Sequence, residues 1–292
     1  ALTAVLGFSS LVACFFMVRW VFGLSAAVTA TILIAFSWPA IFYSQEVRAY
    51  SLVLLVAIFV TAVWLQILLH RQSGSHSSRP YWALVILAPV LSFAHLYGFI
   101  FAAFLWIYLF AADLFRRDPL AARWSAFGFF ITNLAFLPWL AINMRAMADS
   151  EMLDLTPLDR PGASFFVDVG AFMYHHPIPA LLLGLGPILL GSRRTFPRIW
   201  TAFRARNLNE PLLGLICVIV IPFVAVFVFS QFKPILYTRY LMVFVPAGIF
   251  FTALAFEEWR QQSPWRRHVA LLAVAAISLA WILPDHYRYR SK

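Results

Sequence analysis

The chain has 292 residues, of which 63% are hydrophobic and only 12% are charged. Soluble domains carry about twice that share of charged residues, so this composition excludes a soluble globular protein. The net charge of +10 could point to nucleic acid, but the basic residues stand in short segments between apolar runs. That distribution is a topology signal of membrane proteins. We therefore expect membrane lipids, and no nucleic acid, among its partners.

Apolar runs of about 15 to 22 residues recur along the chain, and this is the length a helix needs to cross a bilayer. They predict an all-α fold, a polytopic transmembrane helical bundle of about ten spans. Cys14 and Cys217 fall inside apolar runs, so we interpret them as core thiols and not as a disulfide. We expect one transmembrane domain over residues 1–292, with the spans at about 1–18, 24–42, 50–69, 81–94, 98–115, 124–143, 178–192, 211–230, 240–256 and 268–283.

Alternation of these spans divides the connecting segments between two membrane faces. Most of the Lys and Arg residues fall on one face, which the positive-inside rule assigns to the cytoplasm. The opposite, outer face then receives segments 43–50, 95–98, 144–177 and 233–240, together with the tail after Pro284. These segments carry the polar clusters of the chain, so we expect those clusters to lie together outside the membrane.

The first polar cluster is Tyr-Ser-Gln-Glu-Val-Arg-Ala-Tyr at residues 43–50. A charge near the middle of a bilayer costs about 2.5 to 3.5 kcal/mol, so this cluster belongs at an interface or in a cavity. If the segment is helical, Glu46 and Tyr50 share one face, and Gln45 and Arg48 share the neighbouring one. The alternative is an interfacial turn in which Glu46 and Arg48 satisfy each other.

Two further clusters stand at the outer ends of predicted spans. His95-Leu96-Tyr97-Gly98 lies at a hairpin turn, where the histidine has either a structural or a functional role and Gly98 permits a tight turn. Segment 231–240 carries two cations and two phenols ahead of an apolar run. The alternative to a functional role is an anchor at the membrane interface, with Arg and Tyr side chains reaching toward the headgroups. Its polar candidates are Lys233, Tyr237, Arg239 and Tyr240.

The longest predicted outer segment, 144–177, carries several acids and ends near His175 and His176. Adjacent histidines chelate one metal poorly from a helix, where spacings of i and i+4 are needed. We therefore predict no metal site and no cofactor; a divalent metal is compatible with the chain but has no support in it. On the inner face, residues 193–206 interleave arginines with aromatic residues, a pattern typical of an interfacial helix against anionic lipid.

Taken together, the motifs resemble a known family. Tyr-Ser-Gln-Glu-x-Arg-x-Tyr at the outer end of a span, followed by His-x-Tyr-Gly and a late Arg-Tyr pair at 239–240, is similar to bacterial GT-C superfamily membrane glycosyltransferases of the family 39-like, protein-mannosyltransferase type. The resemblance implies a GT-C-like fold in the bacterial cytoplasmic (inner) membrane. It also implies inverting transfer of a sugar, at the outer face, from a polyprenyl-monophosphate donor to a lipid, glycan or protein acceptor.

The resemblance also implies roles for individual residues. The leaving phosphate needs positioned cations, for which Arg48, Lys233 and Arg239 are the candidates. Glu46 and His95 are expected to support catalysis. Donor phosphate and sugar binding is expected from Tyr43, Gln45, Arg48, Tyr50, Tyr97, Lys233, Tyr237, Arg239 and Tyr240. The family carries its acidic base in the first outer loop, which would lie upstream of residue 1, so we expect that this sequence lacks an N-terminal span and that loop.

Two other functions are compatible with the same residues. A transporter or flippase of a polyprenyl-linked anion would also place Arg and His in a membrane cavity. It would further require polar groups at mid-span, and the predicted spans are almost free of charge there. A lipid-phosphate-binding protein without catalytic activity is the second alternative, since the expected base is outside the sequence.

Overall fold

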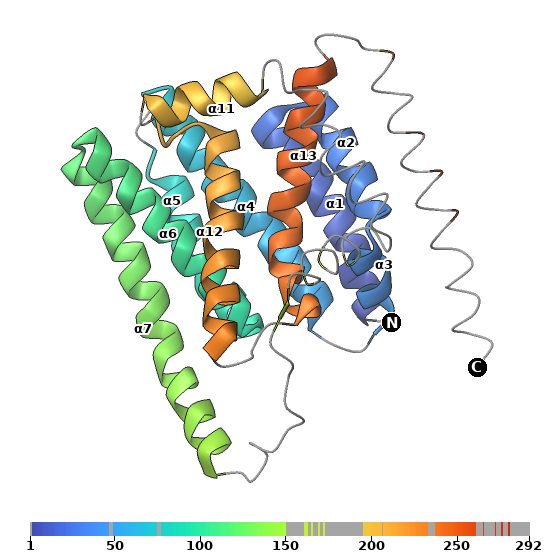
Figure 1. Ribbon diagram of the computed structural model, residues 1–292, viewed down its shortest axis with the longest axis vertical. Coiled ribbons are helices and arrows are strands. Elements are labelled where there is room, and N and C mark those ends of the chain that lie inside the picture. The colour runs from blue at the N-terminus through green and yellow to red at the C-terminus, as the bar shows by residue number, and fades with distance from the viewer. Residues whose placement is uncertain are drawn as a thin grey trace.

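The structure is a computed structural model that describes residues 2–46, 49–74, 77–149, 161–162, 195–205, 207–232 and 237–260, with single positions 165, 169, 172, 265, 272, 276 and 280. The described residues form a bundle of helices without strands (Figure 1). Its elements are α1 (Leu2–Phe22), α2 (Leu24–Ala35), α3 (Trp38–Gln45), α4 (Tyr50–Gln72), α5 (Arg79–Ala94), α6 (Leu96–Arg116), α7 (Pro119–Asp149), α11 (Thr195–Arg204), α12 (Pro211–Phe232), η3 (Thr238–Phe244) and α13 (Val245–Arg260).

Six candidate spans, one of them formed by η3 and most of α13, are long and apolar enough to cross a membrane. The bent pair α2–α3 forms a seventh span if it is counted as one. The eight predicted spans between residues 1 and 143 and between 211 and 256 each correspond to a described helix or bent pair, although α5 is short, with 16 residues. This confirms the predicted polytopic helical bundle. The predicted spans at 178–192 and 268–283 lie outside the continuously described residues.

Helix α4 is the centre of the bundle and is the most buried of the candidate spans. It packs against α1, α5, α6, α12, α13 and η3. The outer helices α1 and α7 instead expose large apolar side chains along their length, among them Phe8, Phe16, Phe130 and Leu137. A continuous apolar surface of this kind is rare on soluble monomers and matches contact with lipid chains.

The bend between α2 and α3 has a local cause. The two helices meet at 56°, and Pro39 stands in the first turn of α3. A proline has no backbone N–H and its ring clashes with the carbonyl four residues earlier, so the preceding helix cannot continue through it. The Ser37 hydroxyl donates to the carbonyl of Ile34 at 3.0 Å and closes the break. The bend redirects the chain so that α3 ends beside α4.

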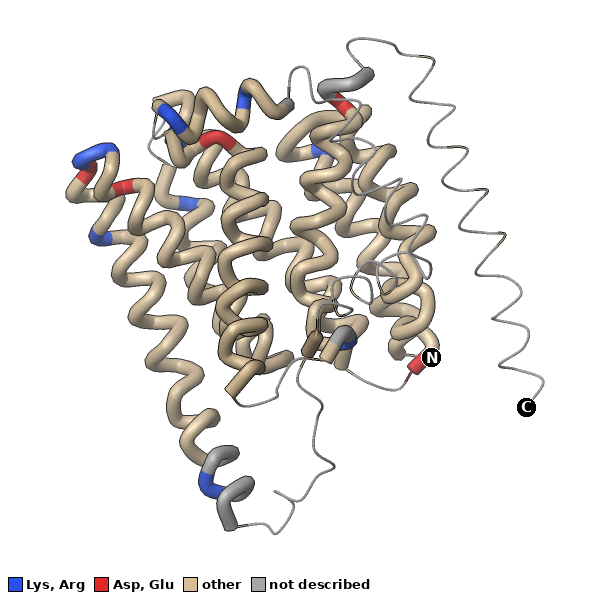
Figure 2. Tube along the Cα trace, in the orientation of Figure 1, with Lys and Arg blue, Asp and Glu red and all other residues tan. Residues whose placement is uncertain are grey.

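The two ends of the bundle differ in charge. Arginines gather at the end where α11 lies (Figure 2), in the last turns of α1, α4, α6 and α11 and near the starts of α5 and α7. We call this the α11 end. The end of α3, the start of α4, the α5–α6 turn at His95 and the start of η3 are at the opposite end. The described helices therefore separate the basic segments from the predicted polar clusters in space.

A buried ion pair fixes the packing at the α11 end. Arg71 Nη2 lies 2.7 Å from Asp113 Oδ2, and Nη2 and Nε both donate to the Tyr81 hydroxyl, at 2.6 and 2.8 Å. The Ser125 hydroxyl donates to the same carboxylate at 2.7 Å. Since these side chains come from four consecutive helices, the network holds α4, α5, α6 and α7 together. Sequence alone left Arg71 in a loop, whereas the structure buries it.

Candidate functional site

Three segments that are far apart in sequence converge at the end of the bundle opposite α11. Their aromatic, imidazole and guanidinium side chains form one connected group, which we call the aromatic cluster. Its members come from the end of α3, the start of α4, the α5–α6 turn and η3. They are Tyr43, Tyr50, His95, Tyr97, Tyr237, Arg239 and Tyr240.

The first part of the cluster joins α3 to α4. The rings of Tyr43 and Tyr50 are 4.5 Å apart, and both residues are buried. The Ser51 hydroxyl donates to the Tyr43 carbonyl at 2.8 Å and secures the chain reversal. Phe172 adds a ring 6.3 Å from Tyr43. Tyr43 lies in the last turn of α3 and Tyr50 is the first residue of α4, while Glu46 has extended backbone angles after α3 ends. Glu46 and Tyr50 therefore do not belong to one helix, and the shared helix face that we considered for them is wrong.

His95 stands at the centre of the cluster. It adopts extended backbone angles between α5 and α6, and its Nδ1 accepts a hydrogen bond from the Tyr97 backbone N–H at 3.1 Å. The proton of the neutral ring is therefore on Nε2. The imidazole centroid lies 5.0 Å from Tyr240, 5.7 Å from Tyr50 and 5.8 Å from Tyr97. One ring thus joins α4, α6 and η3.

The protonation state of His95 follows from its surroundings. Burial, and after it the positive charge of Arg239, lowers the pKa of His95 below its ordinary value. The side chain is therefore neutral at pH 7 and presents Nε2–H as a hydrogen-bond donor. A neutral donor beside a fixed cation is well suited to an anion, because it adds a hydrogen bond without a second buried charge.

The α5–α6 turn depends on Gly98. A Cβ atom at this position would stand 2.2 Å from the Leu91 carbonyl oxygen and 2.9 Å from its carbonyl carbon. Only glycine allows α5 and α6 to approach this closely. The turn is closed by hydrogen bonds from the His95 N–H to the Leu91 carbonyl at 3.2 Å and from the Gly98 N–H to the His95 carbonyl at 2.8 Å. Gly98 thereby sets the position of His95.

Arg239 brings the positive charge to the cluster. Its guanidinium carbon lies 4.6 Å from the Tyr237 ring centroid and 5.3 Å from that of Tyr240, distances at which cation and ring attract. Its Nε is buried and has no hydrogen-bond partner within the described part of the chain. Buried donors are nearly always satisfied, so this N–H is a candidate to bind an anionic ligand.

The remaining predicted site residues are not members of the aromatic cluster. Gln45 is exposed at the last residue of α3, and Glu46 follows it, partly buried. Arg48 and Lys233 lie outside the described residues. So do His175 and His176, and no group of three or more His, Cys, Asp or Glu within the described ranges could hold a metal.

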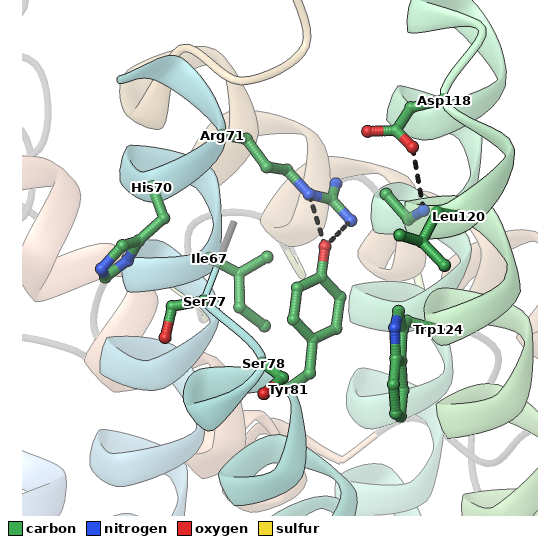
Figure 3. A pocket seen from close by; sticks show the side chains of 10 residues that line it. Ile67, His70, Arg71, Ser77, Ser78, Tyr81, Asp118, Leu120 and Trp124 are labelled. Carbon is green, nitrogen blue, oxygen red and sulfur yellow. Dashed lines mark hydrogen bonds between the residues drawn. The ribbon is translucent and has the colours of Figure 1, made fainter. Parts of the chain in front are cut away.

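A separate cavity lies at the α11 end (Figure 3). It has a volume of about 200 Å³ and is lined by residues of α4, α5, α7 and the α4–α5 turn, including His70, Arg71, Tyr81 and Trp124. All three guanidinium nitrogens of Arg71 already donate to protein groups, the third through Nη1 to the Leu109 carbonyl at 3.2 Å. The hydrogen bonds of Arg71 therefore hold the helices together, and we do not assign it a role in binding a ligand. Sequence reasoning missed the network, for which the one signal was an aspartate, Asp113, inside an apolar run.

Two solved structures share this fold over nearly the whole of the chain, and their fold is the GT-C fold, which confirms the predicted GT-C-like architecture. No protein-family model matches the sequence, and no curated protein matches it either.

Both solved structures are crystal structures of ArnT from Cupriavidus metallidurans. The apo state has a TM-score of 0.56 and 19% identity, over 95% of this chain and 49% of ArnT. The complex with undecaprenyl phosphate has a TM-score of 0.53 and 18% identity, over 96% of this chain and 50% of ArnT. The chain thus spans about half the length of ArnT, and at this identity the likeness concerns the fold.

Proposed function

We propose that this protein is a membrane glycosyltransferase that moves a sugar, with inversion, from a polyprenyl-monophosphate donor to an acceptor at the outer face of the bacterial cytoplasmic membrane. The observation that carries the proposal is the convergence of Tyr50, His95, Tyr97, Arg239 and Tyr240 at one end of the helical bundle. The fold shared with ArnT, which binds undecaprenyl phosphate, is consistent with it.

In this proposal the donor phosphate binds at Arg239. The guanidinium lies against the Tyr237 and Tyr240 rings, and its buried Nε–H has no hydrogen-bond partner among the described residues. The His95 Nε2–H supplies a neutral donor to a second phosphate oxygen. Arg48 and Lys233 remain sequence candidates for additional cations. Preorganised donors of this kind stabilise charge as it develops on the leaving group, because they need no reorientation during the reaction.

The sugar would lie among the phenols. Tyrosine offers an apolar ring face for stacking and a hydroxyl for hydrogen bonding, and the cluster contains five tyrosines. The acceptor oxygen attacks the anomeric carbon, the bond from that carbon to the phosphate oxygen breaks, and polyprenyl phosphate leaves. The acceptor proton goes to the carboxylate base that the family resemblance implies. A protein-mannosyltransferase type of substrate stays a prediction.

Orientation is part of the proposal. The arginine-rich α11 end is proposed to face the cytoplasm by the positive-inside rule. The aromatic cluster is at the other end of the bundle, so it would face outward. A cysteine replacing Gln45, which is exposed, should then react with a membrane-impermeant thiol reagent added to intact spheroplasts. Labelling only after the membrane is opened would reverse the orientation.

The decisive test is transfer itself. Membranes that contain the protein are supplied with polyprenyl-phosphate sugars, and release of polyprenyl phosphate is measured for wild type, Arg239→Ala and Arg145→Ala. Arg145 is an exposed arginine at the same end of the bundle, so it controls for the loss of a cation. We expect Arg239→Ala alone to lose turnover. Binding of the donor without release by wild type would favour the non-catalytic lipid-phosphate-binding alternative, and equal turnover of all three proteins would remove Arg239 from the site.

A further inference from the structure

Helix α11 lies crosswise over the ends of neighbouring helices and not along the bundle axis (Figure 1). Its exposed apolar side chains are Phe196, Trp200 and Phe203, at spacings of four and three residues. Those spacings put them on one face of the helix. An exposed apolar face of this kind marks a surface that contacts lipid, a ligand or a partner.

The other side of α11 is fastened to the bundle. Arg198 Nε lies 2.9 Å from Oε1 of the buried Glu210, and the side chain of Gln72, the last residue of α4, donates to Glu210 Oε2 at 3.3 Å. The Tyr108 hydroxyl donates to the Leu208 carbonyl at 2.6 Å and ties the following turn to α6. The helix is thus fixed at the level where α4 ends and α12 begins. Arg198 is committed to this anchoring.

An apolar hollow of about 200 Å³ lies between α11 and α12. It is lined by Phe196, Ile199, Trp200, Phe203 and Leu213, all apolar. The guanidinium carbon of Arg204 lies 4.8 Å from the ring centroid of Trp200, one of the residues that line the hollow. An apolar hollow with a cation against one of its lining rings matches the chemistry of an anionic amphiphile.

We propose that the α11–α12 hollow is a binding site for an anionic phospholipid of the surrounding membrane. A segment of an acyl chain covers the exposed aromatic face, and the headgroup phosphate pairs with Arg204. We assign a lipid to the hollow because the hollow lies near the ends of α4 and α12. If α4 and α12 cross the membrane, their ends meet the headgroups, and tryptophan and arginine are enriched at that boundary.

Charge complementarity selects anionic lipid over neutral lipid. Arg204 is exposed and forms no described ion pair with an acidic residue. Its guanidinium is therefore accessible to an anionic headgroup. The segment 193–206 contains three further arginines besides Arg198 and Arg204. Basic residues near a membrane surface each add attraction to anionic lipid.

Binding of phosphatidylglycerol and phosphatidylcholine to the detergent-purified protein, measured by native mass spectrometry, tests the proposal. We expect phosphatidylglycerol to bind more tightly, and Arg204→Gln to weaken it about fivefold while leaving phosphatidylcholine unchanged. Arg123→Gln is the matched control, because Arg123 is an exposed arginine at the same end of the bundle. Phe203→Ser should weaken both lipids.

Equal binding of the two lipids by wild type would overturn the proposal, as would equal effects of Arg204→Gln and Arg123→Gln. An unaltered elution volume in size-exclusion chromatography shows that each variant is folded. The readout does not depend on sugar transfer, so it stands or falls separately from the proposed glycosyltransferase activity.

Discussion

Replacing Gly98 by alanine is a direct probe of how the fold positions the candidate site. The added Cβ would stand 2.2 Å from the Leu91 carbonyl oxygen, whereas carbon and oxygen in contact are about 3.3 Å apart. The start of α6 must therefore move by about 1 Å away from α5. The obstacle is backbone, so no change of rotamer relieves it. His95 directly precedes α6 and Tyr97 is in its first turn, so both would move with it, away from Tyr240.

Two effects of opposite sign decide the stability of Gly98→Ala. Alanine favours a helix over glycine by about 1 kcal/mol, while overpacking costs about 1 to 3 kcal/mol. We expect a net loss and a lower melting temperature. For the site, a displacement of about 1 Å is enough to reduce turnover about 100-fold.

Gly128→Ala provides the control, because its Cβ would meet the buried Trp106 side chain at 2.3 Å between α6 and α7, away from the aromatic cluster. Thermal melting and donor release are measured on both variants. We expect both to be less stable and only Gly98→Ala to lose most of its activity. A Gly98→Ala protein that is more stable than wild type and fully active would refute the close packing of α5 on α6.

Three more predictions follow from single contacts. Arg71→Met leaves the Asp113 carboxylate buried without its cation, so we expect a loss of about 3 to 5 kcal/mol, partly recovered in Arg71→Met/Asp113→Asn; a single variant that melts like wild type would contradict the buried pair. Burial, and secondarily Arg239, lowers the pKa of His95, so below pH about 6.5 the unfolded chain binds more protons than the folded one. Stability should then fall between pH 7.5 and 5.5, and His95→Gln should lose less over the same range; equal losses would argue against the lowered pKa. Arg198→Gln removes the tether of α11 and should speed amide exchange of residues 195–204 relative to α6, whereas unchanged exchange would assign no tethering role to this ion pair.

The helices and their alternation could be predicted from sequence because apolar runs of membrane length admit few other structures. The 35 residues between Tyr81 and Phe115 illustrate this: they are too long for one span, and the structure divides them at His95. The same alternation is what brings segments 43–50, 95–98 and 237–240 to one end of the bundle.

The contacts inside the bundle could not be predicted in the same way. Spacing along the chain says nothing about which helices are neighbours, so the contact between Tyr50, His95 and Tyr240 becomes visible only in three dimensions. The pair Arg71–Asp113 was missed for the same reason: an arginine at the end of a span looks like a topology signal until its partner is found 42 residues away. The bend after α2 was not predicted either, although Pro39 was its signal.

The central claim is that the aromatic cluster binds a polyprenyl phosphate through Arg239. The most direct measurement is the affinity of the purified protein for undecaprenyl phosphate and for undecaprenol, in wild type, Arg239→Ala and Arg145→Ala. A lost hydrogen bond to a charged group is worth about 1.5 to 3 kcal/mol, so Arg239→Ala should weaken the phosphate about 10- to 100-fold and leave undecaprenol unchanged. If wild type binds both lipids equally, or if Arg239→Ala and Arg145→Ala bind the phosphate alike, the cluster is not a phosphate site.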